Sequence, residues 1–135
     1  MKKDIQPTPP VEDVAIVAVI EEEHQGELEW SIYLFNMKEH EIQTVLVSSS
    51  GYGQVDGRDV KTSTLRYFLE DVPKLSFRKI EPIKDDLFVL HNEYWVSFYE
   101  NGRLLDKKFT FEPGQITQEN TIPLPFIGKK GVLIR

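Results

Sequence analysis

The sequence predicts an all-β protein, mainly antiparallel, with an immunoglobulin-like β-sandwich of about seven strands and at most one short helix. Three observations predict it. Apolar residues recur with a period of two, the predicted strands are short and regularly spaced, and Asn101-Gly102 marks a β-hairpin. A small β-barrel is the alternative architecture.

The first strand is predicted at residues 14–20, where every residue is apolar. Such a strand is expected to be buried on both faces, as in the centre of a sheet. A polar turn at 21–26 leads to a second strand at 28–35, and a polar turn at 36–40 leads to a third at 41–48. The short connections predict that these three strands form an antiparallel meander.

The clearest local pattern is the hairpin at residues 93–111. Asn-Gly is the favoured pair for a two-residue type I′ turn, because both positions need positive φ. This turn makes Glu100 face Arg103 and Trp95 face Lys108. The predicted core face then holds Tyr94, Val96, Phe98, Leu105, Phe109 and Phe111, with Lys107 as the one misfit, and the outer face holds Trp95, Ser97, Tyr99, Asp106 and Lys108.

The remaining segments are read from weaker patterns. Residues 62–72 fit a short helix capped by Thr62 or Ser63, and they fit a strand equally well. Residues 75–83 predict a strand, with Pro82 placing its end near a sheet edge. Residues 113–135 contain three prolines and predict an irregular tail that packs 126–127 and 132–134 onto the body.

The chain of 135 residues predicts one domain, with an extended N-terminal arm at 1–12 and a single β-sandwich at 13–135 that includes the tail. It has no cysteine, which excludes disulfides and thiol chemistry and favours a reducing compartment. The start of the sequence has no signal-peptide pattern and no apolar run of membrane-spanning length. We expect a cytoplasmic protein, and a net charge of −6 disfavours nucleic acid and anionic membranes as partners.

A glycine-rich stretch, VSSSGYGQVDGRDVKTST, covers residues 47–64. Its glycines have a spacing that suits a dinucleotide pyrophosphate, but such a site needs a following helix and parallel strands, and residues 53–63 hold too few apolar residues for a helix. We therefore predict a long surface connection. If it binds a small molecule or nucleotide, Tyr52 would stack on a ring while Arg58 and Lys61 meet an anion.

Catalytic and metal-binding patterns are missing. The three histidines, at 24, 40 and 91, fall near predicted turns, and no two of them have the spacing that presents two metal ligands from one element. No serine lies in a G-x-S-x-G elbow. The sequence therefore predicts no catalytic residue, no metal and no cofactor, although it does not decide whether the protein is an enzyme.

Several segments carry a resemblance that spans nearly the whole chain. VEDVAI, VLVSSSGYG, KTSTLRYFLEDVP, KIEPI, NEYWVSFYENG with DKKFTF, and GVLIR resemble a family of short bacterial proteins without established function, some of them labelled as a phenylalanyl-tRNA synthetase subunit. A class II synthetase core needs a far longer chain with arginine-bearing motifs, and nothing here matches them. The resemblance thus implies no catalytic residue.

The function that these patterns favour is a non-catalytic protein–protein interaction module. Trp95 and Tyr99 would anchor a protein partner or a second copy, because aromatic residues are favoured at interface centres. One alternative is a small-molecule or nucleotide-binding protein that uses the loop at 51–61. Another is nucleic-acid or translation-related binding, since Arg103, Lys107 and Lys108 lie near the aromatic pair.

Overall fold

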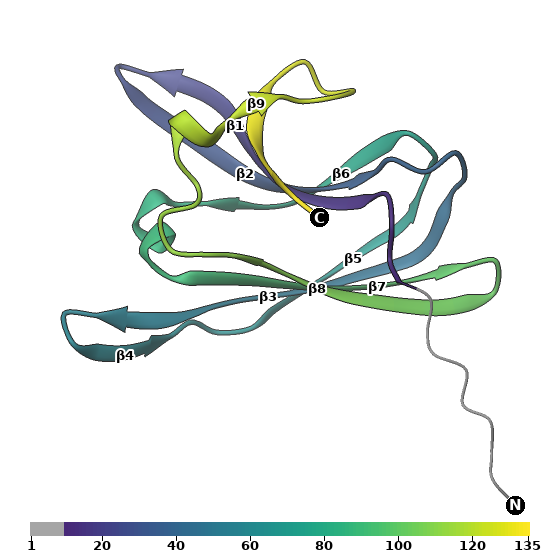
Figure 1. Ribbon diagram of the computed structural model, residues 1–135, viewed down its shortest axis with the longest axis horizontal. Coiled ribbons are helices and arrows are strands. Elements are labelled where there is room, and N and C mark those ends of the chain that lie inside the picture. The colour runs from purple at the N-terminus through teal and green to yellow at the C-terminus, as the bar shows by residue number, and fades with distance from the viewer. Residues whose placement is uncertain (1–9) are drawn as a thin grey trace, which may run out of the picture.

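The computed structural model describes residues 10–135, which form ten strands, two 3₁₀ turns and no α-helix. All strand pairs are antiparallel, and they build two open sheets that face each other (Figure 1). Sheet A has the order β6-β2-β1-β10-β9, with β1 Val14–His24, β2 Glu27–Asn36, β6 Ser76–Ile83, β9 Ile122–Pro123 and β10 Lys130–Ile134. None of the helical turns within these residues is long and apolar enough to cross a membrane.

Sheet B has the order β4-β3-β7-β8, with β3 Ile42–Val55, β4 Arg58–Lys61, β7 His91–Glu100 and β8 Arg103–Phe111. A further strand, β5 Leu65–Val72, pairs with the first half of β3, while β4 pairs with its second half. The 3₁₀ turns η1 (Asp85–Val89) and η2 (Gln118–Asn120) lie in the connections that follow β6 and β8. The β3–β4 hairpin extends beyond the sandwich at the left of Figure 1.

The pairing order confirms an immunoglobulin-like sandwich rather than a closed barrel. Strands β1, β2 and β6 pair as A-B-E do in that fold, and β3, β7 and β8 pair as C-F-G. With β5 these make the seven predicted strands. Strand β4 prolongs the β3 hairpin, and β9 with β10 widens sheet A.

The main core lies between the sheets, and a second cluster covers the outer face of sheet A. Ile16 and Leu34 of sheet A meet Val96 and Phe98 of sheet B in the main core. The second cluster consists of Ala15, Val17, Val19, Tyr33, Phe35 and Leu124, with Phe77, Ile127 and Leu133 packed against it. Strand β1 is therefore buried on both faces, as its apolar run predicts.

The β7–β8 hairpin confirms the predicted register pair by pair. Glu100 faces Arg103, Trp95 faces Lys108, and all six predicted core residues are buried. Asn101 and Gly102 both have positive φ, as a type I′ turn requires. The misfit Lys107 is half-buried and places its ammonium 5.1 Å from the centre of the Phe109 ring.

The predicted meander of the first three strands is wrong. The 14–20 strand continues through the expected polar turn to His24, so that the turn is only Gln25-Gly26. Strand β3 then leaves sheet A and pairs with β7 in sheet B. A short connection fits a crossing between the sheets of a sandwich as well as a hairpin, and the apolar pattern does not distinguish them.

The glycine-rich stretch is a hairpin and not the predicted long connection. Strand β3 runs through Gly51 and Gly53 to Val55, and Asp56-Gly57 forms a two-residue turn with both φ angles positive. Asp-Gly is a favoured pair for such a turn. The scarcity of apolar residues hid the strand, because the β3–β4 hairpin projects into solvent and has little core to contact.

Two other segments are more regular than the sequence indicates. Residues 65–72 form strand β5, so the helical alternative is wrong. The prediction of a wholly irregular tail is also wrong, because β10 pairs with β1 on one side and with β9 on the other. Only residues 10–12 of the predicted N-terminal arm lie within the described range, and they form neither strand nor helix.

Candidate functional site

Large apolar side chains gather on the outer face of sheet B. Trp95 and Tyr99, the two predicted anchors, are 47% and 40% exposed. The other members are Leu46, Phe68 and Leu104, which are 47%, 59% and 55% exposed. We call these five side chains the apolar face.

The strand register makes the apolar face continuous. Leu46 lies opposite Ser97 on β7 and opposite Phe68 on β5, while Tyr99 lies opposite Leu104 on β8. Trp95 and Tyr99 flank Ser97 on the same face, so each is a diagonal neighbour of Leu46, at a typical separation of about 7–8 Å. The five side chains therefore span four adjacent strands without a gap.

A β-bulge turns Leu46 outward. Thr44 has a φ of 51°, and the pairing of β3 shifts between Ile42 and Val45. The backbone N–H of Thr44 donates to Asp71 Oδ1 at 3.0 Å, which fixes the bulge against β5. After this extra residue, Val45 and Val47 enter the core and Leu46 faces solvent.

The rim of the apolar face carries charges of both signs. Lys108 lies 5.9 Å from the Trp95 ring centre, the cross-strand cation–π pair that the register predicts, and 4.0 Å from Glu93. Arg66 lies opposite Ser48 at the β5 side. Because Lys108 is already close to a carboxylate, the rim forms no uniformly basic surface for a nucleic-acid strand.

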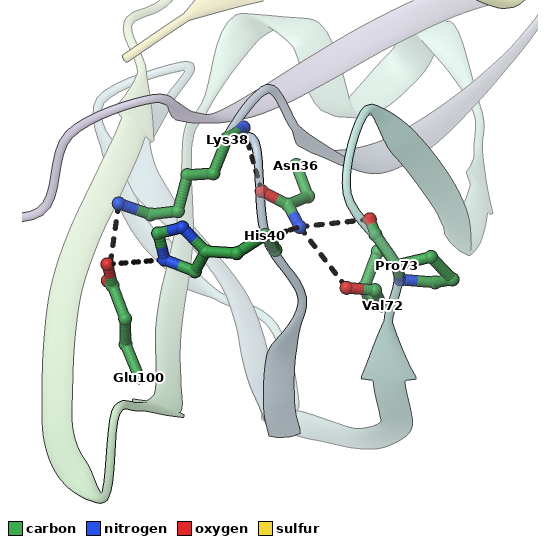
Figure 2. A network of polar contacts seen from close by, with 6 residues as sticks. All are labelled: Asn36, Lys38, His40, Val72, Pro73 and Glu100. Atoms are coloured by element: carbon green, nitrogen blue, oxygen red, sulfur yellow. Dashed lines mark hydrogen bonds and ion pairs between the residues drawn. The ribbon is translucent and has the colours of Figure 1, made fainter.

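A buried asparagine and a salt bridge fix one corner of the sandwich, where Asn36 and Glu100 make polar contacts (Figure 2). Asn36 donates to the carbonyls of His40, Val72 and Pro73 at 2.9–3.2 Å and accepts from the backbone N–H of Lys38. It thereby joins the β2–β3 and β5–β6 connections, both of which cross between the sheets.

Glu100, the neighbour of Tyr99, anchors this corner to β7. It lies 3.2 Å from Lys38 Nζ and 2.8 Å from His40 Nε2. Burial opposes ionisation of Glu100, but the hydrogen bonds from His40 and Lys38 outweigh it and lower the pKa of this carboxyl. The charged network therefore holds the strand end that presents Tyr99.

The three predicted ligand-binding residues of the glycine-rich stretch do not form one site. Tyr52 stacks on His91, with ring centres 4.9 Å apart, and lies opposite Lys61. Arg58 is three positions from Lys61, so by strand alternation it projects from the other face of the hairpin. The register therefore places Lys61 on the same face as the Tyr52 ring and Arg58 on the opposite face.

A polar cluster that the sequence patterns did not reveal lies between the sheets, around Glu81. Its Oε1 accepts from Ser49 at 3.0 Å and Tyr67 at 2.6 Å, and its Oε2 accepts from Tyr94 at 2.7 Å. Burial and then the bond to Glu81 raise the pKa of Tyr67 to about 12, and burial with the Glu81 charge raises that of Tyr94 further. The available signal was an acid between two isoleucines in the strand segment KIEPI.

Glu81 also lines a small cavity of about 240 Å³ at the edge of the sandwich. The lining includes Gly51, Thr62 and Asn92, which come from β3, from the β4–β5 connection and from β7. A wider open groove of about 1130 Å³ follows β2 and β6, and among its charged residues Lys79 and Lys129 each pair with Glu21.

Within residues 10–135, no histidine is placed to act as a general base toward a serine or threonine hydroxyl. Each lies beside a carboxylate, in the pairs His24–Glu22, His40–Glu100 and His91–Glu112, and none is hydrogen-bonded to a serine or threonine. Glu22, His24 and Glu29 lie close enough to share a cation, but all three are exposed and their ion pairs account for the grouping.

No family model matches this chain, and no curated protein is significantly similar to it. The resemblance to short bacterial proteins, the cytoplasmic location and the site residues thus stay predictions. The fold and the surfaces described above are the basis for any functional proposal.

Proposed function

We propose that this protein is a non-catalytic β-sandwich module that binds another protein through the apolar face of sheet B. The observation that supports it is the continuous exposure of Leu46, Phe68, Trp95, Tyr99 and Leu104. Three of the five are aromatic, and tryptophan and tyrosine are enriched among residues that dominate binding energy.

The size of the apolar face supports this proposal. An aromatic side chain buries about 150–250 Å² when it is fully covered, so the exposed fractions correspond to roughly 500 Å² of apolar surface. The largest apolar patch of a typical monomer covers about 300–600 Å² and often has a function. A specific interface covers about 800 Å² on each partner, which the apolar face and its charged rim would together supply.

The shape of the surface indicates the kind of partner. The apolar face lies across four strands of one sheet, so it presents a broad surface and not a deep pocket. A partner with its own sheet face or with an amphipathic helix would cover it, with opposite charges meeting Arg66, Lys108 and Glu93 at the rim.

A site-specific photo-cross-linker tests the proposal. Placed at Ser97, in the middle of the apolar face, it should capture one discrete protein in cells of the source organism. The matched position is Val89, which is 56% exposed but lies on η1. Capture from Ser97 alone, lost on adding Trp95→Ser and Tyr99→Ser, supports the proposal.

Other results would contradict binding at the apolar face or would identify the partner as a second copy of the chain. Equal capture from both positions, or none from Ser97, contradicts binding at the apolar face. Sedimentation of the purified protein identifies a second copy as the partner if the dimer is lost in the Trp95→Ser, Tyr99→Ser variant.

A further inference from the structure

The cavity beside Glu81 has an unusual charge balance. Among its twelve lining residues Glu81 is the one carboxylate, and none is Lys, Arg or His. No basic nitrogen of residues 10–135 lies within 4.0 Å of the Glu81 carboxylate, whose partners are three hydroxyl groups. Hydroxyl donors orient a carboxylate but leave its negative charge in place.

A second acceptor belongs to the same cavity. The side-chain nitrogen of Asn92 donates to the carbonyls of Leu87 and Leu90, at 2.8 and 3.3 Å, which fixes the orientation of the amide. Its Oδ1 accepts no hydrogen bond from residues 10–135, and no fully buried polar side-chain atom there lacks a partner. The oxygen is therefore accessible, although Asn92 as a whole is only 5% exposed.

Gly51 keeps this space open. A Cβ at Gly51 would lie 3.3 Å from Asn92 Oδ1 and 3.2 Å from Thr62 Cγ2, so a larger residue at this position would narrow the cavity. The volume of about 240 Å³ equals that of roughly eight water molecules. A ligand of a few heavy atoms fits such a space.

We propose that this cavity binds a small organic cation, a guanidinium or primary ammonium compound, which donates N–H groups to Glu81 and to Asn92 Oδ1. A carboxylate and an amide oxygen, without a competing cation, are the acceptors that such a group requires. The site uses Gly51 of the glycine-rich stretch, but its charge selects a cation, whereas Arg58 and Lys61 had suggested an anion. It is independent of the apolar face.

Titration with a matched pair of probes, followed by two-dimensional amide NMR, tests the proposal. Methylguanidinium and its neutral counterpart methylurea have nearly the same shape, and sodium chloride keeps the ionic strength constant. Methylguanidinium should produce saturable shifts at the amides of Gly51, Thr62, Glu81 and Asn92, and methylurea should not. Absent or non-saturable shifts, or equal shifts from both probes, would overturn the proposal.

Three variants locate the interaction. Glu81→Gln keeps the shape but removes the charge, and should weaken methylguanidinium binding about tenfold to a hundredfold. Gly51→Ala keeps Glu81 and should also weaken it by narrowing the cavity. Glu39→Gln, at an exposed position in the β2–β3 connection and outside the cavity lining, is the matched control and should leave affinity unchanged; equal loss in Glu39→Gln and Glu81→Gln would contradict the site. If Glu81→Gln fails to fold, the Gly51→Ala variant and the comparison with methylurea still test the proposal.

Discussion

Replacement of Asn36 should destabilise the protein more than its single side chain suggests. Asn36 is fully buried, and its amide serves three carbonyls and one N–H in the two crossing connections (Figure 2). Asn36→Ala removes these bonds and leaves the carbonyl of Val72 without this donor in a buried position. A buried polar group that is left without a partner costs about 1–3 kcal/mol, and the loss of the other three Asn36 hydrogen bonds, which are only partly buried, adds to this cost.

We therefore expect Asn36→Ala to lower the free energy of unfolding by about 3 kcal/mol. For a domain of this size that corresponds to a fall in Tm of roughly 10 °C. Urea denaturation followed by tryptophan fluorescence measures it, and Asn120→Ala is the control, because Asn120 is exposed and its side chain donates to one carbonyl. A loss below about 1 kcal/mol for Asn36→Ala would refute the reasoning.

Asn36→Asp separates the donor role from the acceptor role. The introduced carboxylate still accepts from the N–H of Lys38, but it faces three carbonyl oxygens that need a donor. Burial and these oxygens should raise its pKa, so this variant should gain stability relative to wild type as the pH is lowered. A constant difference from pH 7 to pH 4 would show that the carbonyls do not need the Asn36 donor.

Three further predictions concern other parts of the molecule. Burial opposes ionisation of Glu21, but bonds from Lys129 and Tyr33 lower its pKa to about 2; its ionised form therefore stabilises the fold above about pH 4.5. The stability difference between wild type and Glu21→Gln, about 1 kcal/mol at pH 7, should vanish in urea titrations as the pH falls toward 2. Gly131→Ala should cost about 3 kcal/mol in denaturant unfolding, because its Cβ would collide with the carbonyl oxygen of Ala18; a wild-type midpoint would contradict this contact. The Trp95→Ser, Tyr99→Ser variant should stay within about 1 kcal/mol of wild-type stability by the same assay, because both side chains are largely exposed; a larger loss would mean that the apolar face supports the fold.

The parts of the fold that could be predicted are those with a local signal. The type I′ turn at Asn101-Gly102 sets the register of β7 and β8, and the register sets which side chains face outward. The hairpin therefore predicts that Trp95 and Tyr99 lie on the outer face. The two apolar sets of β1 predict a central strand, because they need two covered faces.

Long-range pairing could not be predicted in the same way. Nothing near β3 in the sequence shows that it leaves β2 for β7, and nothing near β10 shows that it pairs with β1. Leu46 faces outward because a bulge at Thr44 shifts the alternation of β3, and Phe68 faces outward because a second register shift, beside Glu70 with its φ of 63°, does the same in β5. The Glu81 cavity combines residues from distant strands, so its charge balance emerges only in three dimensions.

The position of β10 bears on how the chain is made. Val17 of β1 pairs with Leu133, so β1 cannot complete its strand pairing in the centre of sheet A until residues more than a hundred positions later have been synthesised. Until then, Val17 and Phe35 on the outer side of sheet A lack the cover that Leu124 and Leu133 provide. On the ribosome the nascent chain would thus expose an unpaired strand edge and an apolar surface, which is the state that chaperones recognise. Folding of this sandwich should therefore be completed late, when β10 closes against β1.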